Sequence, residues 1–352
     1  MSADRFGIGV IGTGMAAKPH AGALRDLEEI LDVRGVFSRD PDKRAAFAEN
    51  FGFPVANSID ALADDPELKA VILITPPSER LDLVRRFAGA GKHILMEKPV
   101  ERTTAAAREI VSICEQNGVR LGIVFQHRFR QASIVLKERI DSGVLGAIGL
   151  VRVSVPWWRE QAYYDEPGRG TYARDGGGVL ISQAIHALDL ILSIAGPVAQ
   201  VQAVAATTPF HHMEAEDFVA GGMRFDNGAA GSLMATTAAF PGGAESITID
   251  CEAASAHLQS GTLTLSWRDG RTETVGEAAG TGGGADPMAF PHDWHRDLIR
   301  DFVDAVKSGR EPAVTGREAL RVHHLIDALM ESSRDGRAVN LITARSGANN
   351  PD

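Results

Sequence analysis

The sequence predicts an α/β protein with two domains, a doubly wound parallel domain followed by a domain with an open, mainly antiparallel sheet. The first third of the chain alternates short apolar runs with helix-length patterns, which is typical of a parallel sheet. After about residue 126 the rhythm changes to strand-like runs joined by hairpin signals such as "DNG" and "RDG". A length of 352 residues also exceeds the usual size of one domain.

The apolar runs of the first domain predict five strands, at 6–12, 32–38, 70–75, 93–98 and 119–125. Stretches with helical spacing accompany them. Right-handed crossovers between parallel strands then place helices on both faces of the sheet.

The second domain begins with a predicted helix over 133–142, strands near 147–155, a loop rich in Trp, Tyr and Gly up to 178, and a helix over 179–194. Strands are expected within 199–207, 217–225, 228–238, 246–252, 256–260 and 262–268. Amphipathic helices over 295–309 and 316–333 close the chain, after a glycine-rich loop at 276–287. We therefore expect domains at 1–125 and 126–340 and a loose tail at 341–352.

Composition limits the kinds of partner. With 44% hydrophobic and 23% charged residues the chain is typical of globular proteins, and its formal net charge of -10 argues against binding nucleic acid. The N-terminus shows neither a signal peptide nor a membrane span. Two cysteines make a disulfide framework improbable and favour a reducing compartment, so we expect a cytoplasmic protein.

A glycine turn follows the first strand, with the pattern Gly12-x-Gly14-x-x-Ala17 at the start of a helix. Gly12 permits the tight turn, Gly14 lets the backbone approach a pyrophosphate, and Ala17 lets helix and strand pack closely. The alternative is a plain strand-to-helix turn. Because the motif opens a βαβ unit, we predict a dinucleotide site that includes Thr13, Met15 and Ala16 of the same turn.

The second strand bears on the choice of cofactor. It ends in Ser38 and Arg39, where NAD sites usually have an acidic residue, and Arg39 suits a 2′-phosphate. Asp40 leaves NAD open, so we expect NADP in preference to NAD. Thr75 and Pro76, after the third strand, should lie along the path of the cofactor.

Lys98 ends the fourth strand, at the edge of the sheet that should face the cofactor. Pro99 restricts its backbone and so fixes the direction of the ammonium group. Two interpretations remain, a catalytic lysine or a salt bridge with Glu97.

A second group of polar residues lies around "DGGGVLISQAIHALDL". Helical spacing places Ser182 and His186 on one face, with Gln183 beside it. A lone histidine in an apolar helix is often structural, but the preceding loop carries Trp158 and Arg169, which suit a polyhydroxylated or carboxylated ligand. A loop that only packs on the surface is the alternative.

Together, "GVIGTGMAAKPHAGAL", "GKHILMEKPV", "FQHRFR", "GGGVLISQAIHALDL" and "DFVDAVKSGREPAVTG" resemble the Gfo/Idh/MocA oxidoreductase family. The resemblance implies a Rossmann domain and a second α/β domain whose open sheet often forms a subunit interface, hence a homodimer or homotetramer. It also implies that Glu97, Lys98 and Gln126 contact the cofactor, that Lys98 lies near the nicotinamide, and that His186 helps to move the proton. Lysine and histidine suit alcohol oxidation, which needs a base for the hydroxyl proton.

The sequence departs from the family pattern at two positions. Many members have Asp or Asn where this chain has Ser182, which moves the base function onto His186 and Lys98 and leaves Gln183 to position substrate. Many also have a histidine where this chain has Arg80, a position whose role is mostly structural.

The leading hypothesis is an NAD(P)-dependent enzyme that interconverts a secondary alcohol and a ketone on a sugar, cyclitol, nucleotide sugar or cyclic cis-diol. The alternatives are an NAD-dependent glycosidase that oxidises C3 transiently and a non-enzymic cofactor-binding regulator. No metal site is predicted, because the adjacent histidine pairs 211–212 and 323–324 point apart in either a strand or a helix.

Overall fold

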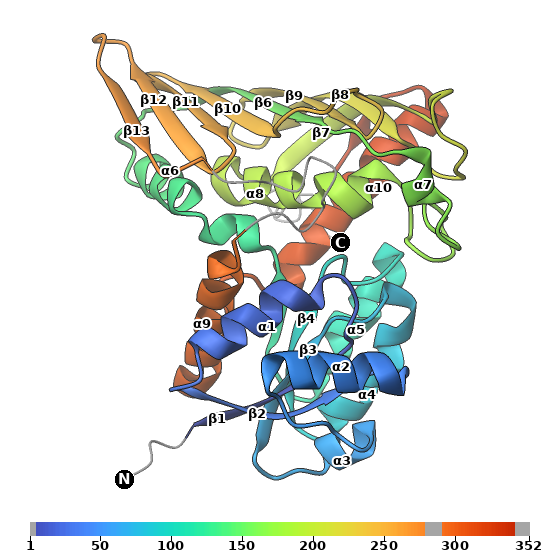
Figure 1. Ribbon diagram of the computed structural model, residues 1–352. Coiled ribbons are helices and arrows are strands. Elements are labelled where there is room, and N and C mark those ends of the chain that lie inside the picture. Colours follow the sequence, from blue (N-terminus) through green and yellow to red (C-terminus); the bar gives the residue numbers. More distant parts are fainter. Residues whose placement is uncertain (1–4, 279–290, 342–352) are drawn as a thin grey trace, which may run out of the picture. The chain divides into compact units, whose positions relative to one another are not determined.

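The computed structural model describes residues 5–278 and 291–341, and these form two compact units (Figure 1). The first unit combines residues 1–126 with 291–320, and the second combines residues 127–290 with 321–352. The expected boundaries at 1–125 and 126–340 differ from this division at one segment, because 291–320 belongs with the first unit. The predicted tail lies, apart from residue 341, outside the described residues.

The first unit is built on a five-stranded sheet of order β2-β1-β3-β4-β5 in which every neighbouring pair is parallel. Its strands are β1 (Phe6–Ile11), β2 (Leu31–Phe37), β3 (Leu68–Leu73), β4 (His93–Glu97) and β5 (Leu121–Val124). All six residues of β1 and all four of β5 are buried, as expected of parallel strands covered on both faces. The doubly wound sheet is confirmed, and its strands agree with the predicted ones to within two residues at either end.

The helices of the first unit are α1 (Ala17–Asp26), α2 (Pro41–Phe51), α3 (Ile59–Ala63), α4 (Arg80–Gly89), α5 (Thr104–Gln116) and α9 (Asp293–Ser308), with a short 3₁₀ turn η1 (Pro77–Glu79). α1 packs on α9, and α4 packs on α5. A Cβ on Gly22 of α1 would lie 2.9 Å from the ring of His292, so this glycine lets the start of α9 come close. That packing explains why a segment far along the chain joins the first unit.

The second unit contains a nine-stranded sheet of order β13-β12-β11-β10-β6-β9-β8-β7-β14. Its strands are β6 (Ile148–Pro156), β7 (Val198–Ala206), β8 (Phe218–Phe225), β9 (Ala230–Thr236), β10 (Ser246–Cys251), β11 (Ala254–Gln259), β12 (Thr262–Trp267), β13 (Thr272–Val275) and β14 (Val339–Asn340). Only the β6–β9 pair is parallel, so the predicted, mainly antiparallel sheet is confirmed. Alternate residues of β10 and β11 are buried, as in a sheet with one covered face.

The second unit has the helices α6 (Gln131–Asp141), α7 (Gln161–Tyr164) and α8 (Ile185–Ala195), the 3₁₀ turn η2 (Gln126–Phe129) at its start and the π-helical turn η3 (Leu180–Ala184). α10 (Gly316–Asp335) runs across the boundary between the units. α6 and α8 pack against the sheet. The short elements α7, β13 and β14 were not predicted, and most of the expected glycine-rich loop at 276–287 lies outside the described residues.

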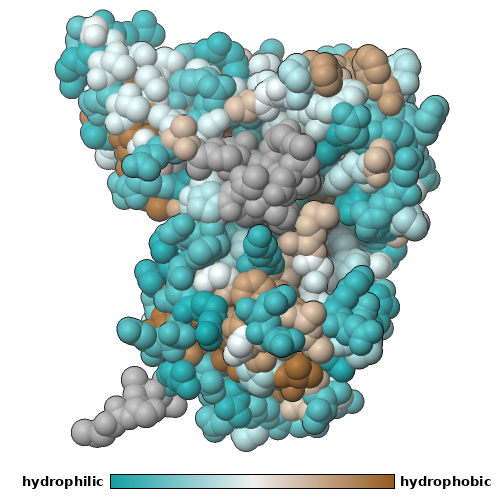
Figure 2. All heavy atoms as spheres, in the orientation of Figure 1, coloured by the Kyte–Doolittle hydropathy of each residue, from teal (hydrophilic) through white to brown (hydrophobic). Residues whose placement is uncertain are grey.

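Most large apolar side chains are buried, and hydrophobic residues are scattered among hydrophilic ones on the face shown in Figure 2. Cys114 and Cys251 are both buried and unpaired, as expected of core residues. Burial raises the pKa of the Cys114 thiol to about 12. Among the described residues, no helix combines the length and the apolar character needed to cross a membrane.

Candidate active site

The strand order reverses between β1 and β3, so the loops that follow these two strands diverge and leave a crevice at the carboxyl edge of the sheet. Gly12 lies there with φ +106°, and its amide donates a 2.8 Å hydrogen bond to the carbonyl of Phe37. A Cβ at this position would lie 2.9 Å from the carbonyl carbon of Ile74. Both the backbone angle and the close approach therefore require glycine, which brings the turn against the end of β3.

The residues of this edge fit a dinucleotide. Among the described residues other than its chain neighbours, none has an atom within 4 Å of where a Cβ on Gly14 would be, so this glycine faces open space there. Several buried polar atoms in the described part of the chain have no hydrogen-bond partner, and two of them lie at this edge, Thr75 Oγ1 after β3 and Gln126 Oε1 after β5. Ala16 is the N-cap of α1 and provides no side-chain cap, so the first amides of the helix are not occupied by a capping side chain.

At the end of β2 the three polar residues have different surroundings. Ser38 accepts a 3.1 Å hydrogen bond from the hydroxyl of Thr13, which links this strand to the glycine turn. Asp40 caps α2, because its Oδ1 accepts the amides of Asp42 and Lys43 at 3.0 Å each. The side chain of Arg39 is 77% exposed and lies 3.3 Å from Glu79. The carboxylate of Asp40, the residue that would favour NAD, thus caps its own helix, whereas Arg39 is exposed.

Lys98 lies at the same edge, in a backbone segment held by Arg80. The buried guanidinium of Arg80 donates to the carbonyl of Thr75 at 3.0 and 2.8 Å, and also to the carbonyls of Glu97 and Pro99. Burial lowers the pKa of Arg80 to about 10, and the charges of Glu97 and Glu101 oppose that effect. The guanidinium of Arg80 therefore holds the carbonyls on either side of Lys98 close to the carbonyl that follows β3.

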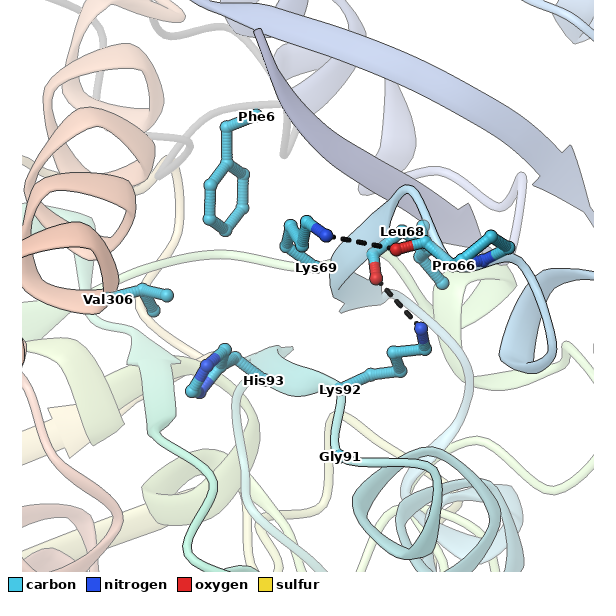
Figure 3. A pocket seen from close by; sticks show the side chains of 8 residues that line it. All are labelled: Phe6, Pro66, Leu68, Lys69, Gly91, Lys92, His93 and Val306. Carbon is cyan, nitrogen blue, oxygen red and sulfur yellow. Dashed lines mark hydrogen bonds between the residues drawn. The ribbon is translucent and has the colours of Figure 1, made fainter. Parts of the chain in front are cut away.

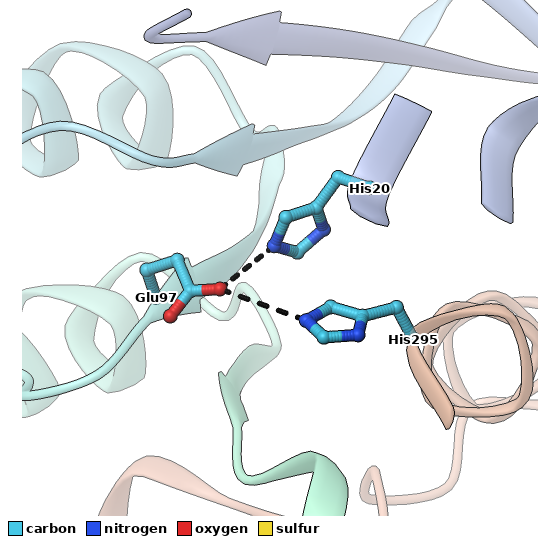
Figure 4. Close-up of side chains that lie close together, drawn as sticks. All are labelled: His20, Glu97 and His295. Carbon is cyan, nitrogen blue, oxygen red and sulfur yellow. Dashed lines mark hydrogen bonds and ion pairs between the residues drawn. The ribbon is translucent and has the colours of Figure 1, made fainter. Parts of the chain in front are cut away.

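The carboxylate of Glu97 points into a buried cluster with His20 of α1 and His295 of α9 (Figure 4). His20 Nε2 donates a 2.8 Å hydrogen bond to Glu97 Oε1, and His295 Nε2 lies 4.0 Å from that oxygen. Burial would raise the pKa of Glu97, but the hydrogen bond from His20 and the nearby histidine and lysine charges outweigh it and hold the pKa below its usual value. Glu97 Oε2 accepts the amide of Lys98 at 3.2 Å. The Glu97 side chain thus supports the Lys98 backbone.

This cluster also brings three possible metal-ligand atoms within 4.8 Å of one another, the one such set found among the described residues. The hydrogen bond from His20 Nε2 to Glu97 Oε1 uses two of the atoms that a metal ion would need. The arrangement is that of a hydrogen-bonded core cluster. His295 was not among the predicted site residues, and no helix periodicity distinguishes it from an ordinary core position.

In the second unit, three of the predicted substrate residues line one hollow. Arg169, Ser182 and Gln183 line it together with Tyr163, Tyr164, Gly170, Asp175, Gly177, Gly178 and Met213. The hydroxyl of Tyr163 accepts from Arg169 at 3.2 Å and from Gln183 at 3.4 Å. Gln183 Oε1 is buried without a hydrogen-bond partner in the described part of the chain. Tyr163, which sequence reasoning left out, thus connects two of the predicted residues.

Trp158 lies in an aromatic group beside this hollow. Its ring is 6.1 Å from that of Phe210, 5.5 Å from Phe240 and 5.6 Å from His211. Phe210 and Phe240 are 64% and 77% exposed. Trp158 is not among the residues that line the hollow with Arg169, but the ring of His211 also lies 4.8 Å from that of Tyr164, which lines it.

His186 lies in α8, just after the π turn η3, and its ring stacks on that of His127 with centroids 4.6 Å apart. On the same helix, Asp189 accepts two hydrogen bonds from Arg128, of 2.7 and 2.6 Å. The expected shared face with Ser182 assumed an uninterrupted α-helix. Ser182 lies within the π turn, so the shared face stays a prediction, and such turns are frequent at functional sites.

A cavity of about 290 Å³ in the first unit lies away from these residues (Figure 3). It is lined by Phe6, Leu68 and His93, which begin β1, β3 and β4, and by Pro66, Lys69, Gly91, Lys92 and Val306. These are the amino ends of the strands, opposite the glycine turn. Lys92 donates to the carbonyls of Asp65 and Leu68, so its ammonium serves the local backbone.

Comparison with known proteins agrees with this geometry. Residues 6–125 match the model of an oxidoreductase family with an NAD-binding Rossmann fold, and residues 134–257 match the GFO/IDH/MocA C-terminal domain. These two models of one family together cover more than half of the chain. The chain belongs to the Gfo/Idh/MocA family.

Relatives within the Gfo/Idh/MocA family match almost the whole chain. Inositol 2-dehydrogenase of Rhizobium meliloti is 25% identical over 353 residues, covering 96% of this chain and 99% of the relative. D-xylose 1-dehydrogenase (NADP(+)) 2 of Haloferax volcanii is 28% identical over 354 residues, covering 95% and 99%. The crystal structure of the WlbA dehydrogenase from Bordetella pertussis with NADH and UDP-GlcNAcA is 28% identical, covers 96% of this chain and 99% of that one, and gives a TM-score of 0.81.

Membership of the Gfo/Idh/MocA family makes the chain an NAD(P)-dependent oxidoreductase. Its predicted residues divide between the two units, with the glycine turn, Thr75, Lys98 and Gln126 in the first and Trp158, Arg169, Ser182, Gln183 and His186 in the second. No sequence pattern distinguishes Tyr163 or His127, because aromatic and histidine side chains of this kind also occur in ordinary cores. For His127, the quoted "FQHRFR" motif was the one available signal.

Proposed function

We propose that the chain interconverts a secondary alcohol and a ketone on a sugar or cyclitol, with Lys98 and His186 handling the hydroxyl proton. The observation that carries this proposal is the position of Lys98 at the edge that holds the glycine turn. Arg80 ties the carbonyl of Thr75 to the carbonyls on either side of Lys98. Lys98 therefore belongs to the edge whose buried, unpartnered atoms fit a dinucleotide.

The reaction breaks one C–H and one O–H bond of the alcohol. NAD(P)+, when bound, takes up the hydride from carbon. The proton of the hydroxyl group needs a base of the chain, and a lysine amine or a histidine imidazole can accept it near neutral pH. Ser182 has no carboxylate, so in this proposal it positions substrate and leaves the proton to Lys98 and His186.

Support for a polyhydroxylated substrate comes from the hollow of the second unit. The guanidinium of Arg169, the hydroxyl of Tyr163 and the amide of Gln183 converge there. Gln183 Oε1 can accept a hydrogen bond from a substrate hydroxyl, which would satisfy a buried atom. Relatives named for inositol and D-xylose support a sugar or cyclitol, and the WlbA dehydrogenase with UDP-GlcNAcA keeps a nucleotide sugar in the comparison.

We also propose NADP in preference to NAD. Arg39 is exposed beside Ser38 at the end of β2, where a 2′-phosphate would lie. Asp40, the residue that favours NAD, already accepts two amides of α2.

The test is a panel of myo-inositol, D-xylose, levoglucosan and a UDP-sugar, read by nicotinamide absorbance with NAD+ and NADP+ in separate arms. Lys98→Ala is expected still to bind NADPH and to lose about 10²- to 10⁴-fold in turnover. The matched control is Lys137→Ala, which removes an exposed lysine paired with Asp141. Unchanged turnover in Lys98→Ala would contradict the proposed role of the lysine.

The same panel separates the alternatives. A glycosidase that oxidises C3 and reduces it again would cleave an aryl glycoside with no net change in nicotinamide absorbance. A non-enzymic regulator would bind NADP(H) and turn over none of the compounds, in the wild type as in the variant.

A further inference from the structure

We propose that His127 is a positioning residue for His186, an inference that rests on the proposed role of His186. In this proposal His127 is a neutral imidazole with its proton on Nδ1, and the ring of His186 stacks on it. The two rings are 4.6 Å apart between centroids and inclined by 25°. Both residues belong to the second unit, and both side chains are buried.

The tautomer of His127 follows from its partner. Arg130 Nη2 lies 2.6 Å from His127 Nε2, and a guanidinium group can only donate hydrogen bonds. Nε2 must therefore be the acceptor and carry no proton, which leaves the proton of the neutral ring on Nδ1. A protonated His127 would set an N–H against an N–H of Arg130.

Arg130 is itself fixed. Its Nη1 donates a 3.0 Å hydrogen bond to Glu245 Oε1, and the two side chains are only 4% and 7% exposed. Burial lowers the pKa of Arg130, and the Glu245 carboxylate opposes that effect. Because a buried ion pair of this geometry cannot rotate freely, it holds the His127 ring in one orientation.

The charges around His127 balance. Arg130 pairs with Glu245 beside β10, and Arg128 pairs with Asp189 of α8. A further titratable neighbour is His186. When His127 is neutral, its ring face can stabilise the positive charge that His186 gains on taking up a proton. If both rings were protonated, the two stacked imidazolium ions would repel each other.

Nuclear magnetic resonance of the full chain with ¹⁵N-labelled histidine rings tests the tautomer without any substrate. The His127 and His186 signals are assigned from the variants His127→Phe and His186→Phe. We expect His127 to show protonated Nδ1 and bare Nε2, unchanged from about pH 5.5 to about pH 8.5, on either side of the ordinary histidine pKa of about 6.5. Uptake of a proton by His127 in this range, or a proton on Nε2, would overturn the proposal.

The double variant Arg130→Met/Glu245→Gln removes both charges together and avoids leaving one buried charge unpaired. In it, we expect His127 to take up a proton between about pH 5.5 and about pH 8.5, the range in which the wild-type ring stays neutral. A His127 that still fails to titrate would show that its charge state does not depend on Arg130, against the proposal.

Kinetics with the substrate found by the panel test the positioning role. His127→Phe keeps a flat ring and should retain kcat within about threefold, whereas His127→Ala should lower kcat about 10- to 100-fold with an unchanged KM for NADP+, as expected when a reacting group is misplaced. Circular dichroism verifies that both variants fold, and His257→Phe is the control at a half-buried histidine of β11.

If His186→Ala loses turnover while His127→Ala matches the wild type, the positioning role is wrong and the proposed function stands. If His186→Ala keeps its turnover, the proposed role of His186 fails, and the resonance experiment still decides the tautomer of His127.

Discussion

At the scale of single residues, Arg80 shows how a position outside the reacting groups can set their geometry. Its guanidinium supplies hydrogen bonds to three backbone carbonyls of two strand ends. The same position is a histidine in many family members, and a histidine ring could not donate to all three. In this chain the arginine therefore carries more of the support for Lys98.

Replacing Arg80 with alanine should lower the free energy of unfolding by about 2 to 4 kcal/mol, because three carbonyls lose their donor in a buried place. Urea unfolding measures the change. The control is Arg86→Ala on the same helix, whose ion pairs with Asp60 and Asp64 are exposed and should contribute far less. If Arg80→Ala lowered the free energy of unfolding no more than Arg86→Ala, water would be replacing the guanidinium as the donor to these carbonyls at no cost in stability.

At the scale of elements, α9 carries His295 from a distant part of the chain to β4 and α1. Burial lowers the pKa of His295 to about 3. This group is neutral in the folded protein at neutral pH, beside a carboxylate that stays ionised. The packing of α1, β4 and α9 thus depends on a neutral His295 and an ionised Glu97.

Acid should weaken this packing in a defined range of pH. The pKa of His295 is lower in the folded state than the ordinary value of about 6.5 in the unfolded chain, so only the unfolded state binds this proton as the pH falls below 6.5. Stability then declines by up to about 1.4 kcal/mol per pH unit, which amounts to about 1.6 kcal/mol between pH 6.5 and pH 5.

Urea unfolding at pH 7, 6 and 5 measures this decline in the wild type and in His295→Leu. The variant has no such proton to bind, so its stability should fall less steeply over this range, whatever its stability at pH 7. Equal slopes in the two proteins would show that His295 takes up its proton in the folded state as well.

At the scale of the whole molecule, the protein presents a parallel unit that fits a dinucleotide and a second unit with one covered sheet face. Assembly into a homodimer or homotetramer through the open face of that sheet, and a cytoplasmic location, stay predictions. So does the joint action of Lys98 and His186, which belong to different units.

Cofactor binding should stabilise the whole fold and report the cofactor preference without a substrate. At a ligand concentration of 100 times Kd the gain is about 2.7 kcal/mol, which for a chain of this size raises Tm by several degrees. We expect a larger shift with NADP+ than with NAD+ at equal concentration, and the difference should vanish in Arg39→Ala. A larger shift with NAD+ would instead assign the pocket to NAD.

The sequence predicted much of the candidate site where a motif combines a backbone requirement with a strand end. Gly12 is such a residue, because both its positive φ and its close approach to Ile74 exclude a side chain. Lys98 is another, because its place after the fourth apolar run puts it at the carboxyl edge. The π turn that contains Ser182 was not predicted, since such a turn leaves no clear mark in the hydrophobic pattern, and the face shared by Ser182 and His186 stays a prediction.

The sequence by itself determined the fold class, the family and the place of the glycine turn and Lys98, because periodicity and local motifs depend on neighbouring residues. Only the tertiary structure decided that α9 joins the first unit, that Arg80 binds the backbone on either side of Lys98, and that His127 stacks on His186. These contacts join residues far apart in the chain or on separate elements. Their partners are chosen by packing and by the burial of charge, which no single stretch of sequence records.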